Sequence, residues 1–339
     1  MININMININ KKLVVISCGL LVVGLILLFL YFFQFLHIKN SAAAYRDLEI
    51  KAGMGLNEIA DQLKAKNFIR SKIIFKIYSL LTSQARHLKP GRYVLPTNIS
   101  LPELVKTLVK GPEEISVVIA PGMTLKEIDE KLTSYNIIKA DELVNLDIKF
   151  LKTDYPWLAE AKTLEGFLFP DTYKFFPNSD INVVIHKFLD NFEIKVLPFL
   201  KKNDNLQQVL ILASLLEKEI PDYEEKRITA GILLKRLKVG IPLQVDASLI
   251  YAKCSGRFLN CPPLTEADYK INSYYNSYLY SGLVSAPICN PSLESIKSVL
   301  NPESTDYWYY LSDPKTKKTI FSKTLEEHNK NRAIYLLRK

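Results

Sequence analysis

The amino-acid sequence predicts an α+β protein with one N-terminal transmembrane helix, a small α+β module and a larger, helix-rich α+β domain. Three observations support this prediction. Residues 13–36 are apolar and uncharged, short apolar segments with glycine turns precede helical patterns in the first half, and helical spacing dominates the second half. About 300 residues follow the apolar run, which is enough for about two domains with their own cores.

The apolar run at residues 13–36 is long enough to cross a membrane. As a helix, its 24 residues would extend about 36 Å, against a hydrocarbon core of about 30 Å. Lys11 and Lys12 precede it directly, which favours an N-terminus in the cytoplasm. A cleavable signal peptide is the alternative, because residues 41–44 are small, but its apolar region usually has only about 7–15 residues. We therefore expect a cytoplasmic tail, a transmembrane helix and a tether at residues 1–12, 13–36 and 37–46.

The composition narrows the classes of partner. The net charge is +9, with basic residues spread along the chain rather than gathered in an arginine-rich block, so nucleic-acid binding is not predicted. A basic chain outside the cytoplasm suits an anionic envelope polymer or lipid headgroups. The sequence has no P-loop, dinucleotide fingerprint, nucleophile elbow or zinc-binding histidine pair, so neither a cofactor nor a metal is predicted.

Two of the four cysteines, Cys254 and Cys261, flank the short segment CSGRFLNC. Outside the cytoplasm they could form a disulfide that closes this segment. A zinc site is the alternative, but none of the four histidines is close in sequence, so we favour the disulfide. Cys289 would then remain unpaired.

The first domain is expected to span residues 47–150. Its first part alternates strand and helix patterns, with Ser71 and Ser100 as N-caps. The expected strands are residues 48–50 and 92–95, and the expected helices are residues 56–63, 69–81 and 100–109.

A second, similar unit follows within this domain. A strand at residues 115–120, a Pro121–Gly122 turn and a helix capped by Thr124 repeat the earlier order of elements. Both helices read Leu-x-x-Ile-x-x-x-Leu, at residues 56–63 and 125–132, which suggests a duplication. The alternative is that any amphipathic helix shows this spacing.

The second domain is expected to span residues 160–339. Helical patterns cover most of it, with one strand pair near the end. We expect helices at about residues 180–200, 205–219, 223–237, 292–300 and 324–337, a loop-rich segment at 244–291 and a strand pair within 307–321.

The best candidate for acid–base chemistry is Glu217, which follows the apolar residues 209–216. Ser214 is the only hydroxyl in that stretch, so the helix is expected to be buried on most sides. Desolvation raises a carboxyl pKa and can keep a glutamate protonated as a general acid. Glu217 shares a helical face with Ala213 and Ser214, whose small side chains would leave space for a ligand, whereas Glu219 lies on another face. The alternative is that these charged residues only form a solvated helix end.

Two further clusters could bind a polar ligand. Gln244 and Asp246 would point the same way on an extended segment, and together they suit sugar hydroxyl or acetamido groups. Alternatively, Asp246 is simply the N-cap of the next helix. Tyrosine and asparagine side chains alternate at residues 272–278, which is typical of carbohydrate grooves and also of ordinary packed loops.

Taken together, these segments resemble the family of endolytic murein transglycosylases (YceG-like, MltG). The resemblance covers most of the chain, and it depends on the order and spacing of several motifs together rather than on any single one. These include the N-terminal anchor, IKAGMGLNEIADQL, KPGRYVL, IAPGMTLKEI, LEGFLFPDTY, ASLLEKE, PLQVDASLIYA, YNSYLYSGL, PICNPSLESIKSVLNP, YWYYLSDP and FSKTLEEHN.

The resemblance implies a LysM-like module after the anchor and a catalytic domain at residues 160–339. It implies cleavage between N-acetylmuramic acid and N-acetylglucosamine of nascent peptidoglycan strands, which leaves 1,6-anhydro ends and terminates elongation. Glu217, the first glutamate of ASLLEKE, would be the single catalytic acid and base. The substrate-binding groove would contain Glu165, Tyr173, Gln244, Asp246, Tyr251 and Asn276.

The chain departs from the family pattern at two loops. Ala247–Ser248 stands where the family usually reads Pro-Thr, and Tyr274 stands where it often has Pro, so the loop geometry is less constrained. The alternatives to a lytic enzyme are a non-catalytic wall-binding scaffold and a hydrolytic muramidase. The expected location is the bacterial inner membrane, with the catalytic domain outside the cytoplasm and peptidoglycan synthases as candidate partners.

Overall fold

The computed structural model describes residues 23–24 and 45–336. Most of the predicted transmembrane helix and nearly all of the tether lie outside this part of the chain. Among the described residues, no helix combines the length and the hydrophobicity needed to span a bilayer. The chain divides into two units, residues 1–114 and 115–339, and each is described separately.

The described part of the first unit is a strand pair covered by helices. Strands β1 and β2 are antiparallel, and alternate residues of both are buried, so one face of the pair is packed against the core. The serines predicted as N-caps, Ser71 and Ser100, accept hydrogen bonds from Ile74 N and Glu103 N. The elements are β1 (Tyr45–Ile50), α2 (Leu56–Ala65), α3 (Lys72–Leu81), β2 (Gly91–Pro96) and α4 (Leu101–Lys110), which confirms the elements predicted here.

The second unit is mainly helical, with two further antiparallel strand pairs among its described residues. Its strands are β3 (Ile115–Val118), β4 (Thr172–Phe175), β5 (Tyr309–Ser312) and β6 (Thr319–Ser322). Its helices are α5 (Leu125–Ser134), α6 (Leu151–Asp154), α7 (Ile181–Val196), α8 (Leu206–Glu219), α9 (Tyr223–Lys238), α10 (Asp246–Lys253), α11 (Leu293–Leu300) and α12 (Leu325–Tyr335). Three short 3₁₀ turns occur at Pro156–Leu158, Leu197–Phe199 and Asp268–Lys270.

The boundary between the units differs from the predicted one. Strand β3 pairs with β4, so that Val117 lies opposite Tyr173, and residues 115–150 therefore belong to the second unit. The predicted strand and the Thr124-capped helix α5 do form, but they pack into the large core of the second unit. A strand places hydrogen-bonding groups at its edges without specifying the partner, and here the partner is more than fifty residues away in sequence.

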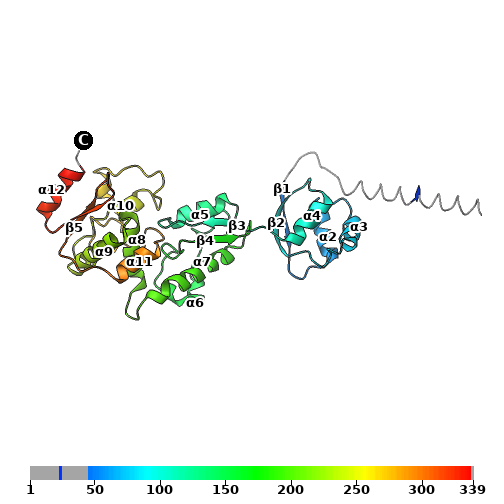
Figure 1. Ribbon diagram of the computed structural model, residues 1–339, viewed down its shortest axis with the longest axis horizontal. Helices are drawn as coiled ribbons and strands as arrows, with labels where there is room; N and C mark the ends of the chain where they lie inside the picture. The colour runs from blue at the N-terminus through cyan, green and yellow to red at the C-terminus, as the bar shows by residue number, and fades with distance from the viewer. Residues whose placement is uncertain (1–22, 25–44, 337–339) are drawn as a thin grey trace, which may run out of the picture. The chain divides into compact units, whose positions relative to one another are not determined.

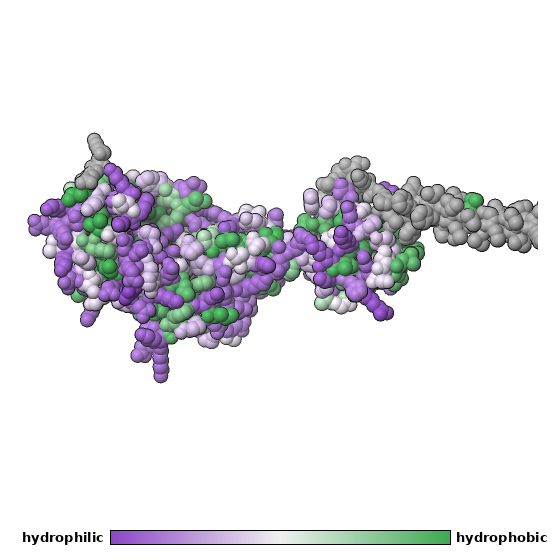
Figure 2. All heavy atoms as spheres, viewed as in Figure 1, coloured by the Kyte–Doolittle hydropathy of each residue, from purple (hydrophilic) through white to green (hydrophobic). Residues whose placement is uncertain are grey.

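Helix α8 is the central helix of the second unit. All residues from Val209 to Leu216 are buried, as predicted, and α9, α10 and α11 pack around the helix (Figure 1). The face of the unit seen in Figure 2 is mainly hydrophilic, with separate hydrophobic patches. Glu217, the candidate acid, lies in the last turn of α8, where the buried apolar residues end.

Candidate functional site

The Glu217 carboxylate is held at the end of α8 by the start of α11. Its Oε2 accepts hydrogen bonds from Ser292 N (2.9 Å), Ser292 Oγ (2.6 Å) and Ser295 Oγ (2.6 Å). The buried Lys226 ammonium of α9 lies 3.7 Å from the same oxygen, and the side chain of Glu217 is 11% exposed. Among the described residues, no hydrogen bond or ion pair involves Oε1 of Glu217. One carboxyl oxygen is therefore fixed, and the other has no protein partner among the described residues.

The Pro121–Gly122 turn packs against the same end of α8. A Cβ atom placed on Gly122 would lie 3.7 Å from Glu217 Cγ and 3.4 Å from Lys218 Nζ. Gly122 has φ +81°, in the left-handed region that glycine tolerates best, and its N–H donates to Asn290 O at 2.8 Å. The turn therefore forms one wall beside Glu217.

Asn290 connects this wall to the rest of the unit. It is fully buried, and its Oδ1 accepts hydrogen bonds from Gly166 N (3.0 Å) and Leu168 N (2.8 Å). Its Nδ2 donates to Met123 O (3.0 Å) and to Glu165 Oε1 (3.2 Å). One side chain thus joins three segments that are distant in sequence.

The space predicted beside Ala213 and Ser214 is filled. Both residues are fully buried, and Ser214 Oγ donates to Ile211 O and accepts from Ile288 N. The pocket near the end of α8 lies instead on the opposite face of the helix, beside Glu219.

That opposite face lines a pocket of about 640 Å³ that contains Glu219, Gln244 and Asp246. Glu219 Oε1 accepts a hydrogen bond from Ala247 N at 3.0 Å, and so it caps α10. Burial, and then the nearby charge of Asp246, raise the pKa of Glu219 to about 7. Asp246 is the first residue of α10 rather than its N-cap, and its Oδ1 accepts the Tyr278 hydroxyl at 2.5 Å. Gln244 and Asp246 therefore face Glu219, not Glu217.

Glu165 and Tyr251 are hydrogen-bonded to each other, next to the Asn290 side chain. Glu165 is buried and accepts hydrogen bonds from Leu125 N (2.9 Å) and the Tyr251 hydroxyl (3.0 Å). Its other partner is Asn290, so it joins the start of α5 to α10 and to the Asn290 segment. Burial raises the pKa of Glu165 to about 8. In this position Glu165 holds three segments of the second unit together and does not line the Glu219 pocket.

The buried Glu165 predicts a pH dependence of stability. The folded carboxyl keeps its proton up to about pH 8, whereas the unfolded one releases it near 4.5, so the folded state binds more protons in between. Its contribution to stability is therefore full below pH 4.5 and is lost as the pH rises towards 8, at up to about 1.4 kcal/mol per pH unit. Urea unfolding of wild type and Glu165→Gln at pH 5 and pH 8 measures this, and we expect a smaller pH effect in the variant. An exposed control, Glu160→Gln, should keep the wild-type pH effect, and an unchanged pH effect in Glu165→Gln would contradict the assignment.

Tyr173 and Asn276 are buried and bonded within the protein. The Tyr173 hydroxyl donates to Phe169 O at 2.6 Å and accepts from Asn191 Nδ2. Asn276 Nδ2 donates to two backbone carbonyls, of Tyr269 and Ile271, at 3.1 and 2.9 Å. Asn276 therefore shapes the loop that carries the pocket tyrosines, and Tyr173 fixes β4 to α7.

The sequence analysis missed Ser292, Ser295 and Lys226, which hold Glu217. Ser292 is a recognisable N-cap, because it accepts from Ser295 N at the start of α11. Its contact with Glu217 spans 75 residues of sequence, and no local pattern reveals it. The predicted disulfide between Cys254 and Cys261 is confirmed, and Cys289 is a buried free thiol. Among the described residues, no cluster of His, Cys, Asp or Glu could hold a metal ion.

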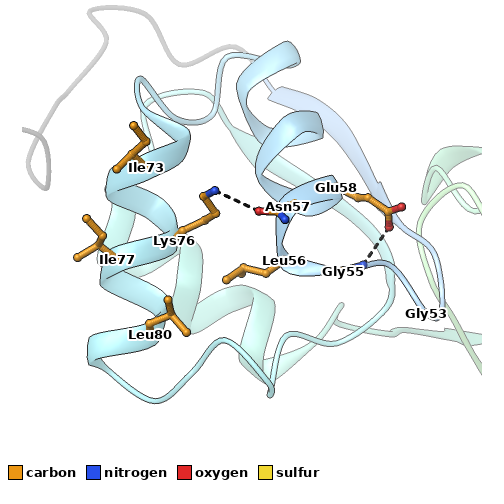
Figure 3. A pocket seen from close by; sticks show the side chains of 9 residues that line it. All are labelled: Gly53, Gly55, Leu56, Asn57, Glu58, Ile73, Lys76, Ile77 and Leu80. Carbon is orange, nitrogen blue, oxygen red and sulfur yellow. Dashed lines mark hydrogen bonds between the residues drawn. The ribbon is translucent and has the colours of Figure 1, made fainter.

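The first unit has a groove of about 730 Å³ between α3 and the loop after β1 (Figure 3). Its acidic side chain, Glu58, accepts the Gly55 N–H at 2.9 Å, and Lys76 donates to Asn57 at 3.1 Å. Leu56 of α2 and three apolar side chains of α3, Ile73, Ile77 and Leu80, also line it. This groove suits binding rather than acid–base chemistry.

Comparisons with known proteins support the family resemblance that the sequence motifs indicate. The YceG-like family profile matches residues 48–334. A Streptococcus pneumoniae (strain D39) protein named endolytic murein transglycosylase is 28% identical, with 89% of this chain and 60% of that protein aligned. A Bacillus subtilis protein of the same name is 29% identical, over 88% of this chain and 87% of that protein. The chain thus spans about 60% of the length of the Streptococcus pneumoniae relatives.

A crystal structure of a yceG-like protein from Listeria monocytogenes has a similar fold, with a TM-score of 0.52 and 29% sequence identity. The alignment covers 86% of this chain and 100% of the Listeria monocytogenes chain.

Proposed function

The chain belongs to the YceG-like family, and on this premise we propose that it is an endolytic murein transglycosylase. The reaction would cleave peptidoglycan glycan strands between N-acetylmuramic acid and N-acetylglucosamine. Two relatives that bear this name align with 88–89% of the chain, which supports the proposal. The observation that assigns the reaction to Glu217 is its carboxyl group, in which one oxygen is held by α11 and the other has no partner among the described residues.

Glu217 would act as acid and then as base. As a carboxylic acid it gives its proton to the glycosidic oxygen while the bond from that oxygen to the muramic C1 breaks. The resulting carboxylate then takes the proton of the muramic C6 hydroxyl while O6 bonds to C1. The acid is regenerated and no water is consumed, so a second catalytic carboxylate is not required, in contrast to hydrolytic glycosidases.

The residues around Glu217 suit these two steps. The Ser292 and Ser295 hydroxyls donate to Oε2 and stabilise the carboxylate. The Lys226 ammonium at 3.7 Å stabilises the carboxylate that exists between the two proton transfers. Fixing Oε2 in this way would leave Oε1 as the atom that exchanges the proton with the substrate.

The products distinguish this proposal from its alternatives. Purified full-length protein incubated with glycan strands should yield muramic ends of 1,6-anhydro form, which mass spectrometry finds one water lighter than reducing ends. Reducing ends alone would indicate a hydrolytic muramidase instead. Strands that are bound but never cut would indicate a wall-binding scaffold.

Three parts of the proposal depend on the sequence patterns. Residues 13–36 would anchor the protein in the inner membrane with the catalytic unit outside the cytoplasm, and membrane fractionation of the chain with and without residues 1–36 tests this. The first unit would be a LysM-like module, and its groove along α3 is where it could hold a strand. Close to the membrane the enzyme would cut nascent strands and terminate their elongation, with peptidoglycan synthases as neighbours.

A further inference from the structure

The disulfide-closed segment Cys254–Cys261 (the stapled loop) is docked on helix α5. The backbone N–H groups of Phe258 and Leu259 donate to Glu127 Oε1 at 2.9 and 3.1 Å. The Arg257 guanidinium forms an ion pair with Glu130, one turn further along α5. The loop is thus closed at its base by the disulfide and fixed at its tip by contacts with a different element.

The docked loop places an aromatic ring over Lys218. The Lys218 ammonium lies 3.8 Å from the centre of the Phe258 ring, a cation–π contact. It also lies close to Gly122, where an added Cβ atom would be 3.4 Å from Lys218 Nζ and 3.7 Å from Glu217 Cγ. The stapled loop and the Pro–Gly turn therefore fix the position of this ammonium beside the candidate acid.

The Lys218 ammonium has unused hydrogen-bonding capacity. Within residues 45–336, Nζ of Lys218 makes no hydrogen bond and no ion pair, and the Phe258 ring occupies none of its N–H donors in a conventional bond. The nearby Lys226, by contrast, is buried and paired with Glu217. Glu127 on α5 accepts backbone N–H groups of Thr124, Phe258 and Leu259, and these hydrogen bonds together with the charge of Lys218 lower its pKa, but no ion pair joins the two side chains among the described residues.

We propose that Lys218, held in place by Phe258 of the stapled loop, binds a carboxylate of the peptide stem carried by the glycan strand. The inference rests on the proposed function, and it adds a specificity determinant to it. The sugars of such a strand are uncharged, whereas the stem peptides carry carboxylates, the groups that an ammonium binds best in a partly dehydrated site. Lys218 would then favour strands with intact stems over strands without them.

Binding tests this without depending on turnover. Full-length protein carrying Glu217→Gln is titrated with glycan strands that bear intact peptide stems and with the same strands after an amidase has removed the stems and the lactyl carboxylates that it frees have been converted to amides. We expect tighter binding of the stem-bearing strands. Adding Lys218→Gln should weaken their binding about tenfold and change the binding of stem-free strands less than about twofold, since one charge-assisted contact is lost.

Three further variants separate a contact with the stem from a merely structural role. Lys218→Arg keeps the charge and should keep the preference for stems. Phe258→Ala should reduce it about threefold, and the double variant Cys254→Ser/Cys261→Ser should act in the same direction. Phe199→Ala is the matched control, because Phe199 forms a similar contact with Lys297 at 4.1 Å and should not affect the preference.

Two outcomes would overturn the proposal. One is equal affinity of the Glu217→Gln protein for both kinds of strand. The other is an equal loss on both kinds of strand in Lys218→Gln. If Glu217→Gln by itself leaves cleavage unchanged, the catalytic assignment fails, yet the comparison of the two strands still decides the role of Lys218.

Discussion

Replacing Glu217 by Gln is expected to slow the formation of 1,6-anhydro ends by about 10²- to 10⁴-fold, the usual contribution of a general acid–base group. Glutamine has nearly the same shape and can still accept hydrogen bonds from Ser292 and Ser295, but it cannot give a proton to the glycosidic oxygen. The measurement is the initial rate of cleavage of purified glycan strands, with the ends identified by mass spectrometry. Binding of the strands should change far less than the rate, because the lost interaction acts on the transition state.

The matched control for this variant is Glu303→Gln. Glu303 is half-exposed and pairs with Arg227 at 2.9 Å, an exposed ion pair that is worth about 1 kcal/mol or less. This control should leave the rate unchanged. A wild-type rate in Glu217→Gln would remove Glu217 from the mechanism and direct attention to Glu219, whose pKa is raised to about 7 in the neighbouring pocket.

Replacing Asn290 by Ala is expected to destabilise the second unit by about 3–5 kcal/mol. The substitution removes four side-chain hydrogen bonds and leaves the N–H groups of Gly166 and Leu168 buried without acceptors. It also frees the segment that fixes the turn at Gly122. The rate of cleavage should therefore fall together with stability.

Tryptophan fluorescence during urea unfolding measures this effect on the second unit alone. The protein has two tryptophans, Trp157 and Trp308, and both lie in that unit. Asn301→Ala is the control, since Asn301 is exposed and its side chain donates only to Lys297 O. A loss below about 1 kcal/mol in Asn290→Ala would show that this network does not hold the site together.

The sequence by itself determined the elements that depend on local interactions. N-cap serines and threonines satisfy backbone donors a few residues away, so the starts of α3, α4 and α5 could be read directly. The continuous apolar stretch of α8 likewise revealed a buried helix whose last turn carries Glu217. The disulfide of the stapled loop was predictable because Cys254 and Cys261 are only seven residues apart.

Only the tertiary structure decided which elements meet. It paired β3 with β4, which moved residues 115–150 into the second unit, and it brought the serines of α11 to Glu217 across 75 residues of sequence. It also placed Gln244 and Asp246 with Glu219 on the other face of α8. The physical reason is that strand edges, carboxylates and caps specify the kind of partner they need, but not where in the chain it lies; that choice depends on how the whole core packs.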